Sequence, residues 1–171
     1  MPRVPLIDEN TRPELAQLIA TIKSERGGKL LRLYQALLNS PPVAEGWLKL
    51  FTAIRQKTEL GGRYRELAIL RVALLNGADY EYRAHLPFAL QEGLSQEQID
   101  ALPGWQLSER FDARERTVLA YTDAMTRGIR VPDAVFAEVR RHFDERETVE
   151  LTATIGGYNL VSRFLVAMQL D

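Results

Sequence analysis

Two histidines occur in the 171 residues, His85 and His142. His85 lies four residues after Glu81, so the two side chains share one face if this segment is helical. An imidazole beside a carboxylate changes charge near neutral pH, as general acid/base catalysis requires. His142 instead follows Arg140 and Arg141 near a predicted helix end, a position typical of a surface cation. His85 is therefore the candidate for acid/base chemistry.

Glu66 is the third group that could join this pair. A turn is predicted at Asn76-Gly77 between two helices, and depth along an antiparallel helical hairpin follows from a rise of about 1.5 Å per residue. Glu66 then lies roughly 15 Å from the turn and His85 roughly 12 Å, so the two could face each other. Glu66 also begins the most apolar helix, where an unpaired carboxylate is costly. The three groups would supply a base, a titrating acid and a charge that sets their pKa values.

Structural roles explain the same residues, and both explanations stay open at this point. Glu81 near a helix N-terminus would offset the helix dipole, and His85 could be a satisfied core residue. Glu66 could instead pair with Arg63 or Arg71. A metal site built from the three side chains is disfavoured, because only one suitable histidine and no thiolate ligand are present. We predict no bound metal and no cofactor.

The elements that would position these residues are helices. Apolar residues recur at helical period between glycines and prolines, and strand patterning is nearly absent. Polar residues suited to the N-cap precede several of these segments: Ser40, Asp79, Ser95, Asp112 and Asp144. Ser95 also forms a capping-box pattern with Gln98, and a loop is expected from Pro103 to Arg110. We predict an all-α, compact helical bundle over residues 1–171, with N-terminal helices in 12–57 packing on a core of 63–171.

Composition and charge restrict the classes of function. The formal net charge is −1, from 22 basic and 23 acidic residues, so there is no basic excess for nucleic-acid binding. The chain has no cysteine, which excludes disulfides, thiolate metal sites and redox dithiols. No apolar stretch reaches bilayer length, and the N-terminus lacks the apolar core of a signal peptide. We expect a cytoplasmic protein that acts on a small molecule and binds neither nucleic acid nor membrane.

A family resemblance is carried by the segment ELAILRVALLNGADYEYRAH, residues 66–85, and by residues 89–99 after it. These stretches resemble the carboxymuconolactone decarboxylase and alkylhydroperoxidase D family. The stretch DARERTVLAYTDAM and Tyr158-Asn159 are similar to the C-terminal half of the same family. The resemblance covers most of the chain from about Trp47 onward. It implies an alkylhydroperoxidase D-like helical fold and a homo-oligomer, a trimer or a hexamer.

The peroxidase branch of that family uses a glutamate, a Cys-x-x-Cys pair and a histidine four residues after the second cysteine. The resemblance places the glutamate on Glu66 and the histidine on His85, whereas the cysteine positions fall on Ala78 and Glu81. Thiol peroxidase activity is therefore disfavoured, because no thiolate is present to attack a peroxide. The decarboxylase branch needs no dithiol and acts on a lactone by acid/base chemistry at a site that contains a histidine.

The candidates for substrate binding are aromatic and polar residues close to these positions: Tyr80, Tyr82, Trp47 and Asn159. A small-molecule pocket needs aromatic walls and a few polar groups, although aromatic residues at helical spacing more often belong to a core or an oligomer interface. Decarboxylase substrates carry carboxylates, so Arg71, Arg83 and Arg163 are candidate cations, each also explicable as a surface or structural charge. Gly156-Gly157 indicates close approach of another helix.

These patterns predict an enzyme that performs acid/base chemistry on a small carbonyl or lactone substrate. His85 would be the general acid/base, Glu66 would orient it or relay protons, and Glu81 would modulate the pair. The alternative is a catalytically silent small-molecule binding or assembly protein of the same fold. A homo-oligomer is also expected because the apolar helix from Glu66 to Leu75 suggests more surface than one subunit covers.

Overall fold

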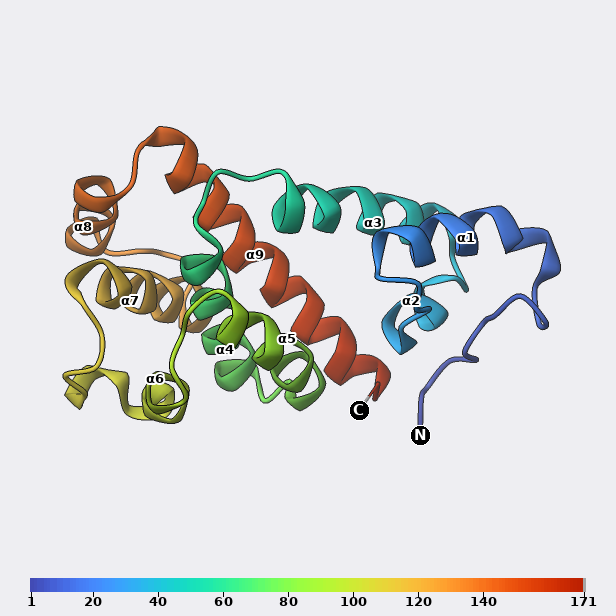
Figure 1. Cartoon of the computed structure of the whole chain (residues 1–171), viewed down its shortest axis with the longest axis horizontal. Coiled ribbons are helices and arrows are strands. Elements are labelled where there is room, and N and C mark those ends of the chain that lie inside the picture. Colours follow the sequence, from blue (N-terminus) through green and yellow to red (C-terminus); the bar gives the residue numbers. More distant parts are fainter. Residues whose placement is uncertain (171) are drawn as a thin grey trace. The chain divides into compact units, whose positions relative to one another are not determined.

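The computed structural model describes residues 1–170, and within them the regular elements are helices without any β-strand. The predicted all-α class is therefore confirmed (Figure 1). The chain divides into two compact units, one formed by Met1–Lys57 with the segment from Leu165 onward, and the other by Thr58–Phe164. Packing of the N-terminal helices on the core as one domain stays a prediction.

The helices follow the predicted punctuation. The first unit contains η1 (Pro13–Leu15), α1 (Ala16–Glu25), α2 (Arg32–Leu37) and α3 (Pro41–Gln56). The second contains α4 (Gly62–Asn76), α5 (Asp79–Gln91), α6 (Gln96–Ala101), η2 (Leu102–Leu107), α7 (Ala113–Arg127) and α8 (Asp133–His142). The long α9 (Glu145–Met168) begins in the second unit and ends in the C-terminal segment of the first.

In the first unit, α1 and α2 pack against α3. Ile19 and Ile22 of α1 are fully buried, and Arg26 donates hydrogen bonds to the hydroxyls of Tyr34 (3.0 Å) and Thr52 (3.1 Å). A recess of about 440 Å³ is lined by side chains of η1, α1 and α3. None of the predicted site residues is among its lining residues.

The most buried helix of the second unit is α4, which packs against α5 and α7. Every residue from Glu66 to Ala73 is buried, as the apolar pattern predicted. Much of this cover comes from helices of the same chain. The all-round apolar pattern therefore does not by itself require a second subunit, and homo-oligomerisation stays a prediction.

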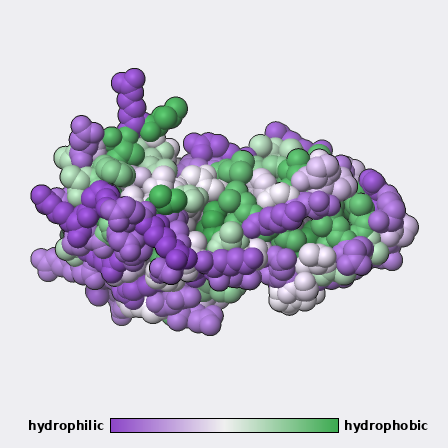
Figure 2. All heavy atoms as spheres, turned by 90° about the horizontal axis from the view of Figure 1, so that it is seen from above, coloured by the Kyte–Doolittle hydropathy of each residue, from purple (hydrophilic) through white to green (hydrophobic). Residues whose placement is uncertain are grey.

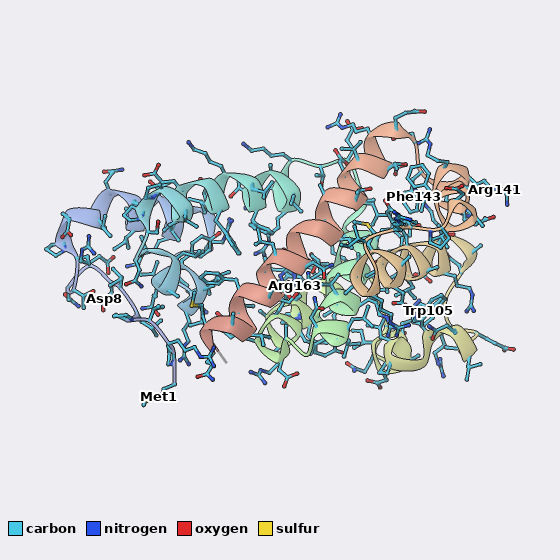
Figure 3. All side chains as sticks on the ribbon, turned by 180° about the vertical axis from the view of Figure 1, so that it is seen from behind. Met1, Asp8, Trp105, Arg141, Phe143 and Arg163 are labelled. Atoms are coloured by element: carbon cyan, nitrogen blue, oxygen red, sulfur yellow. The ribbon has the colours of Figure 1, made fainter. Side chains whose placement is uncertain are left out.

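A buried ion pair joins α4 to α7. Arg71 donates from Nε and Nη2 to the two carboxylate oxygens of Asp123, at 2.6 and 2.9 Å, and from Nη1 to the carbonyl of Leu102 at 2.8 Å. The indole N–H of Trp105, which is labelled in Figure 3, donates to the same carboxylate at 3.3 Å. This bidentate geometry also holds η2 in place. Arg71 is therefore a structural charge, which was one of its two predicted roles.

Most predicted N-caps are confirmed. Asp112 accepts a hydrogen bond from the backbone amide of Glu115 (2.8 Å), whose carboxylate accepts one from the Asp112 amide (2.9 Å). Ser95 and Gln98 form the predicted capping box. Ser40 occupies the N-cap of α3, but its side chain makes no cap hydrogen bond. The prediction for Ser40 is therefore right in position and wrong in its hydrogen bond.

Two boundary predictions are wrong. The N-cap of α5 is Ala78, and Asp79 is the first helical residue, because the Ala78 amide still bonds to the Ala73 carbonyl of α4 (2.9 Å). Asp79 there places its negative charge at the positive end of the helix dipole. The predicted loop from Pro103 to Arg110 lies partly in η2, a 3₁₀ segment that continues directly from α6.

We expect Asp112→Ala to lower the free energy of unfolding by about 1 kcal/mol, because it removes the side-chain acceptor of the Glu115 amide. Ser40→Ala is the matched control, since that N-cap makes no cap hydrogen bond and should change stability far less. Urea denaturation of the two variants and the wild type measures the difference. Equal losses would show that the cap hydrogen bond is not the source of the stability.

Candidate functional site

The link between α4 and α5 brings Glu66 and His85 together. Gly77 ends α4 in the left-handed conformation, with φ +62°, and α5 begins two residues later. The two helices pack along each other, and Glu66 Oε2 lies 2.7 Å from His85 Nδ1. Glu66 and His85 were expected at similar depth from the turn, and in the structure their side chains are in direct contact.

Glu66 is buried, with 2% of its surface exposed, and Arg65 Nε lies 3.2 Å from its Oε1. Burial alone would raise the pKa of this carboxyl, but the hydrogen bond from His85 and the positive charges of His85 and Arg65 outweigh it, so the pKa is lowered. Glu66 is therefore ionised at neutral pH. Arg65 is its partner in place of the suggested Arg63 or Arg71, which bind Glu115 and Asp123.

His85 is held between α4 and α9. Its ring meets the ring of Tyr158 edge to face, with centroids 5.0 Å apart and an angle of 89°, and Phe88 lies 5.9 Å away. Because an ionised Glu66 only accepts hydrogen bonds, His85 Nδ1 carries the hydrogen between them. Nε2 is then the ring nitrogen that would exchange a proton with a substrate.

Glu81 is as buried as Glu66 but lies in a different environment. Neither of its carboxyl oxygens has a hydrogen-bond partner among residues 1–170. Burial raises the pKa of Glu81 to about 8, and the nearby Ser162 hydroxyl offsets only part of the rise. That hydroxyl donates to the Tyr158 carbonyl at 2.5 Å. Glu81 is therefore mostly protonated at neutral pH, whereas Glu66 is ionised.

Two successive turns of α5 meet two successive turns of α9 in reverse order. Glu81 lies by Ser162, and His85 lies by Tyr158. The spacing of four residues on each helix places both contacts on one face of each. Glu81 and His85 therefore point toward the same side of α9.

Asn159 belongs to a hydrogen-bond network that joins α4, α7 and α9. Its amide donates to Thr126 Oγ1 and to the Ile155 carbonyl, each at 3.0 Å. Its oxygen accepts from Asn76 Nδ2 at 3.0 Å and from Arg163 Nη1 at 2.9 Å. All its hydrogen-bonding groups are engaged, so the network accounts for Asn159 without a substrate.

A sequence model of the carboxymuconolactone decarboxylase family matches residues 41–124, which include Glu66, Glu81 and His85. The uncharacterized protein YdfG of Bacillus subtilis is 30% identical over 106 residues, which cover 61% of this chain and 72% of that protein. The chain belongs to the carboxymuconolactone decarboxylase family.

Solved structures show the same fold. A protein of unknown function from Agrobacterium tumefaciens, ATU0492, with a suggested AhpD role in antioxidant defence, is 27% identical, with a TM-score of 0.74 over 79% of this chain and 93% of that one. A cysteine-to-alanine variant of the debrominase Bmp8, in complex with 2,3,4-tribromopyrrole, has a TM-score of 0.80 over 98% and 89% of the two chains. It is 19% identical, so this second likeness concerns the fold alone. The predicted alkylhydroperoxidase D-like fold is confirmed.

This member of the carboxymuconolactone decarboxylase family differs from the peroxidase branch at the two cysteine positions. By the resemblance they fall on Ala78, which is buried at the N-cap of α5, and on Glu81. A buried carboxyl group thus stands where that branch carries a thiol. These residues can move protons but cannot reduce a peroxide through a cysteine.

The other predicted substrate-binding residues lie in varied surroundings. Tyr80 and Tyr82 are half-buried on α5. Burial, with a smaller contribution from the charge of Asp100, raises the pKa of Tyr82. Trp47 is buried in the first unit, where its ring centroid lies 5.1 Å from that of Phe51. Their role in binding stays a prediction.

The structure also places the arginines predicted as substrate-binding cations and the glycine predicted to allow close helix packing. Arg83 is exposed, and Arg163 donates to Asn159 on its own helix. Gly156 is exposed, with no atom of a neighbouring element within 4 Å of the position that a Cβ would take. The expected close approach of another helix is therefore wrong at Gly156.

Neither a metal-binding cluster nor a membrane-spanning helix is found within residues 1–170. No group of three or more histidine, aspartate or glutamate side chains is arranged to hold a metal ion. No helix in this range has both the length and the apolar character needed to cross a bilayer.

Three residues that contact the site were not predicted to do so: Arg65, Tyr158 and Ser162. Arg65 directly precedes Glu66, and adjacent helical residues normally point in different directions. Tyr158 and Ser162 are spaced by four on α9, a spacing that matches Glu81 and His85 on α5. That shared spacing was the one available signal, although it could not show that the two faces meet.

Proposed function

We propose that the chain is an enzyme that performs acid/base chemistry on a small carbonyl or lactone compound, in the manner of a carboxymuconolactone decarboxylase. The observation that carries this proposal is the buried contact of 2.7 Å between ionised Glu66 and His85 Nδ1, one helical turn from a protonated Glu81. Two carboxyl groups whose environments separate their pKa values are typical of acid/base sites. Family membership supports the class of reaction, whereas the identity of the substrate has to be argued from the residues of the site.

His85 is the catalytic residue in this proposal, and Glu66 positions it. Glu66 holds the Nδ1 hydrogen, so Nε2 is the ring nitrogen that exchanges a proton with the substrate. In a decarboxylation, the bond to the carboxylate carbon breaks, carbon dioxide leaves, and the electron pair moves into the carbonyl group as an enolate. Protonated His85 then donates its Nε2 proton to that carbon, and solvent restores the proton of the ring. A neutral Glu81 adds no negative charge that would oppose this step.

A second candidate is a catalytically silent binding protein of the same fold. The observation in its favour is burial: Glu66 and Glu81 expose 2% of their surface and His85 exposes 6%. A sealed polar cluster would serve only to organise helix packing. Homo-oligomerisation and a cytoplasmic location also stay predictions in either case.

The proposal is tested with a panel of small lactones, β-keto acids and 1,3-dicarbonyl compounds in deuterated buffer. Proton NMR follows exchange at the carbon next to the carbonyl, and released carbon dioxide is measured in parallel. We expect at least one compound to exchange or decarboxylate with the wild type and not with His85→Gln. His142→Gln is the matched control, because that half-buried residue is the other histidine and lies at the end of α8. No turnover across the panel, or equal turnover by His85→Gln, would favour the binding protein.

A further inference from the structure

Of the two carboxyl groups of the site, that of Glu81 has no hydrogen-bond partner among residues 1–170. The neighbouring Ser162 hydroxyl is already engaged, because it donates to the Tyr158 carbonyl at 2.5 Å and accepts from the Asn76 amide at 3.0 Å. A buried polar group left without a partner costs free energy, and a catalytic role is one of the explanations for keeping such a group in a native protein. Glu81 therefore has a hydrogen-bonding requirement that residues 1–170 do not meet.

We propose that the carboxylic acid of Glu81 donates a hydrogen bond to the carbonyl oxygen of the substrate, and that the site selects compounds whose carbonyl becomes an enolate. The inference rests on the proposed function and goes beyond it, because it turns Glu81 from a modulating charge into a group that touches the substrate. It also names the chemical class that the site would prefer: carbonyl compounds with an acidic neighbouring carbon.

The placement of the groups supports this assignment. Glu81 and His85 are one turn apart on the same face of α5, so one substrate could reach an acid and a base at once. The base would face the carbon and the acid would face the oxygen of the same carbonyl unit. Such a donor acts on the charge that develops in the transition state, where it is most effective.

The step balances without a further reagent. His85 Nε2 takes a proton from the carbon next to the carbonyl, and the electron pair of that C–H bond forms a carbon–carbon double bond. The carbonyl π pair moves onto oxygen, which accepts the hydrogen bond or the proton of Glu81. Reversal returns each proton to its starting group. Nothing is oxidised or reduced.

A cationic ligand is the less suitable alternative. Burial keeps Glu81 protonated at neutral pH, and its pKa shift has no contribution from a neighbouring charge. A protonated acid needs an acceptor, whereas an ammonium group needs an ionised carboxylate. Four charged residues on the helices around Glu81 are already paired or bonded: Glu66, His85, Arg65 and Arg163.

The test uses 4-nitrophenol as a mimic of an enolate, because its oxygen shares a proton in the same way and its ionisation is visible by absorbance. Titration at neutral pH should give saturable binding to the wild type. Glu81→Leu removes the donor and should weaken binding about tenfold or more. Glu81→Gln keeps an N–H donor and should lie between the two. Asp79→Asn, an exposed acid on the same helix, should bind as the wild type does.

The readout separates this inference from the proposed function. Binding that depends on Glu81, without turnover of any compound in the panel, would support the donor role of Glu81 and contradict the proposed enzymatic activity. Turnover that persists unchanged in Glu81→Leu would support the proposed enzymatic activity and overturn the donor role of Glu81. Absence of 4-nitrophenol binding to the wild type, or equal binding by folded Leu and Gln variants, would overturn it as well. Tighter binding of benzylammonium than of 4-nitrophenol would overturn the donor role and identify Glu81 as part of a cation-binding site.

Discussion

Each of the single variants His85→Gln and Glu66→Gln should lower kcat/KM by about a hundredfold to ten-thousandfold on the compound that the wild type turns over fastest. His85→Gln removes the group that carries the proton. Glu66→Gln removes the charge that fixes the Nδ1 hydrogen, so the ring can present the wrong nitrogen. Because the two side chains act as one unit at 2.7 Å, the double variant should lose little more than either single variant.

Steady-state kinetics of the two single variants and the double variant measure this coupling. Urea denaturation provides the control, since the loss of one buried hydrogen bond should lower stability by only about 1–3 kcal/mol. Losses of activity that multiply in the double variant would mean that Glu66 and His85 act independently. Loss of folding in His85→Gln, together with an inactive wild type, would identify His85 as a core residue.

Replacing Glu81 by glutamine should make stability less dependent on pH. The pKa of Glu81 is about 8 in the folded chain and 4.5 in its ordinary state. Between these values the folded chain keeps a proton that the unfolded chain releases, so raising the pH favours unfolding. The destabilising effect is absent below about pH 4.5 and complete above about pH 8. The difference in unfolding free energy between Glu81→Gln and the wild type should therefore increase by about 3 kcal/mol in favour of the variant as the pH rises from about 5 to about 8.

Urea denaturation at several pH values across this range gives the result directly. Asp79→Asn is the matched control, because it removes an exposed carboxyl group from the same helix and leaves Glu81 in place. A difference between Glu81→Gln and the wild type that stays constant with pH would show that Glu81 is ionised in the folded chain. Its role as a proton donor would then be lost too.

Helical periodicity made the fold largely predictable, because each helix carries its own apolar face and its own end signals. The contact between Glu66 and His85 was predictable for the same reason, since both lie on helices joined by a short turn. The protonation of Glu81 was not predictable from sequence. Its pKa depends on burial and on the absence of a partner, and both depend on how α9 packs against α5.

The roles of the arginines show the same limit. Arg63, Arg65 and Arg71 lie within three turns of one helix, and the sequence offers no way to distinguish their partners. In the folded chain, Arg65 pairs with Glu66, whereas the other two reach carboxylates on α7 that are more than fifty positions away in sequence. Long-range pairing of this kind follows from tertiary packing, which local patterns do not contain.

The short link after Gly77 also determines the rotational phase of α5 relative to α4. One added residue in that link would turn every side chain of α5 by about 100° and shift it by about 1.5 Å. His85 would then leave Glu66, and Glu81 would leave the α9 face beside Ser162. The length of this link is therefore constrained more strongly than the identity of its residues. Homologues that keep the chemistry should vary in the loops near α6 and α8 before they gain or lose a residue here.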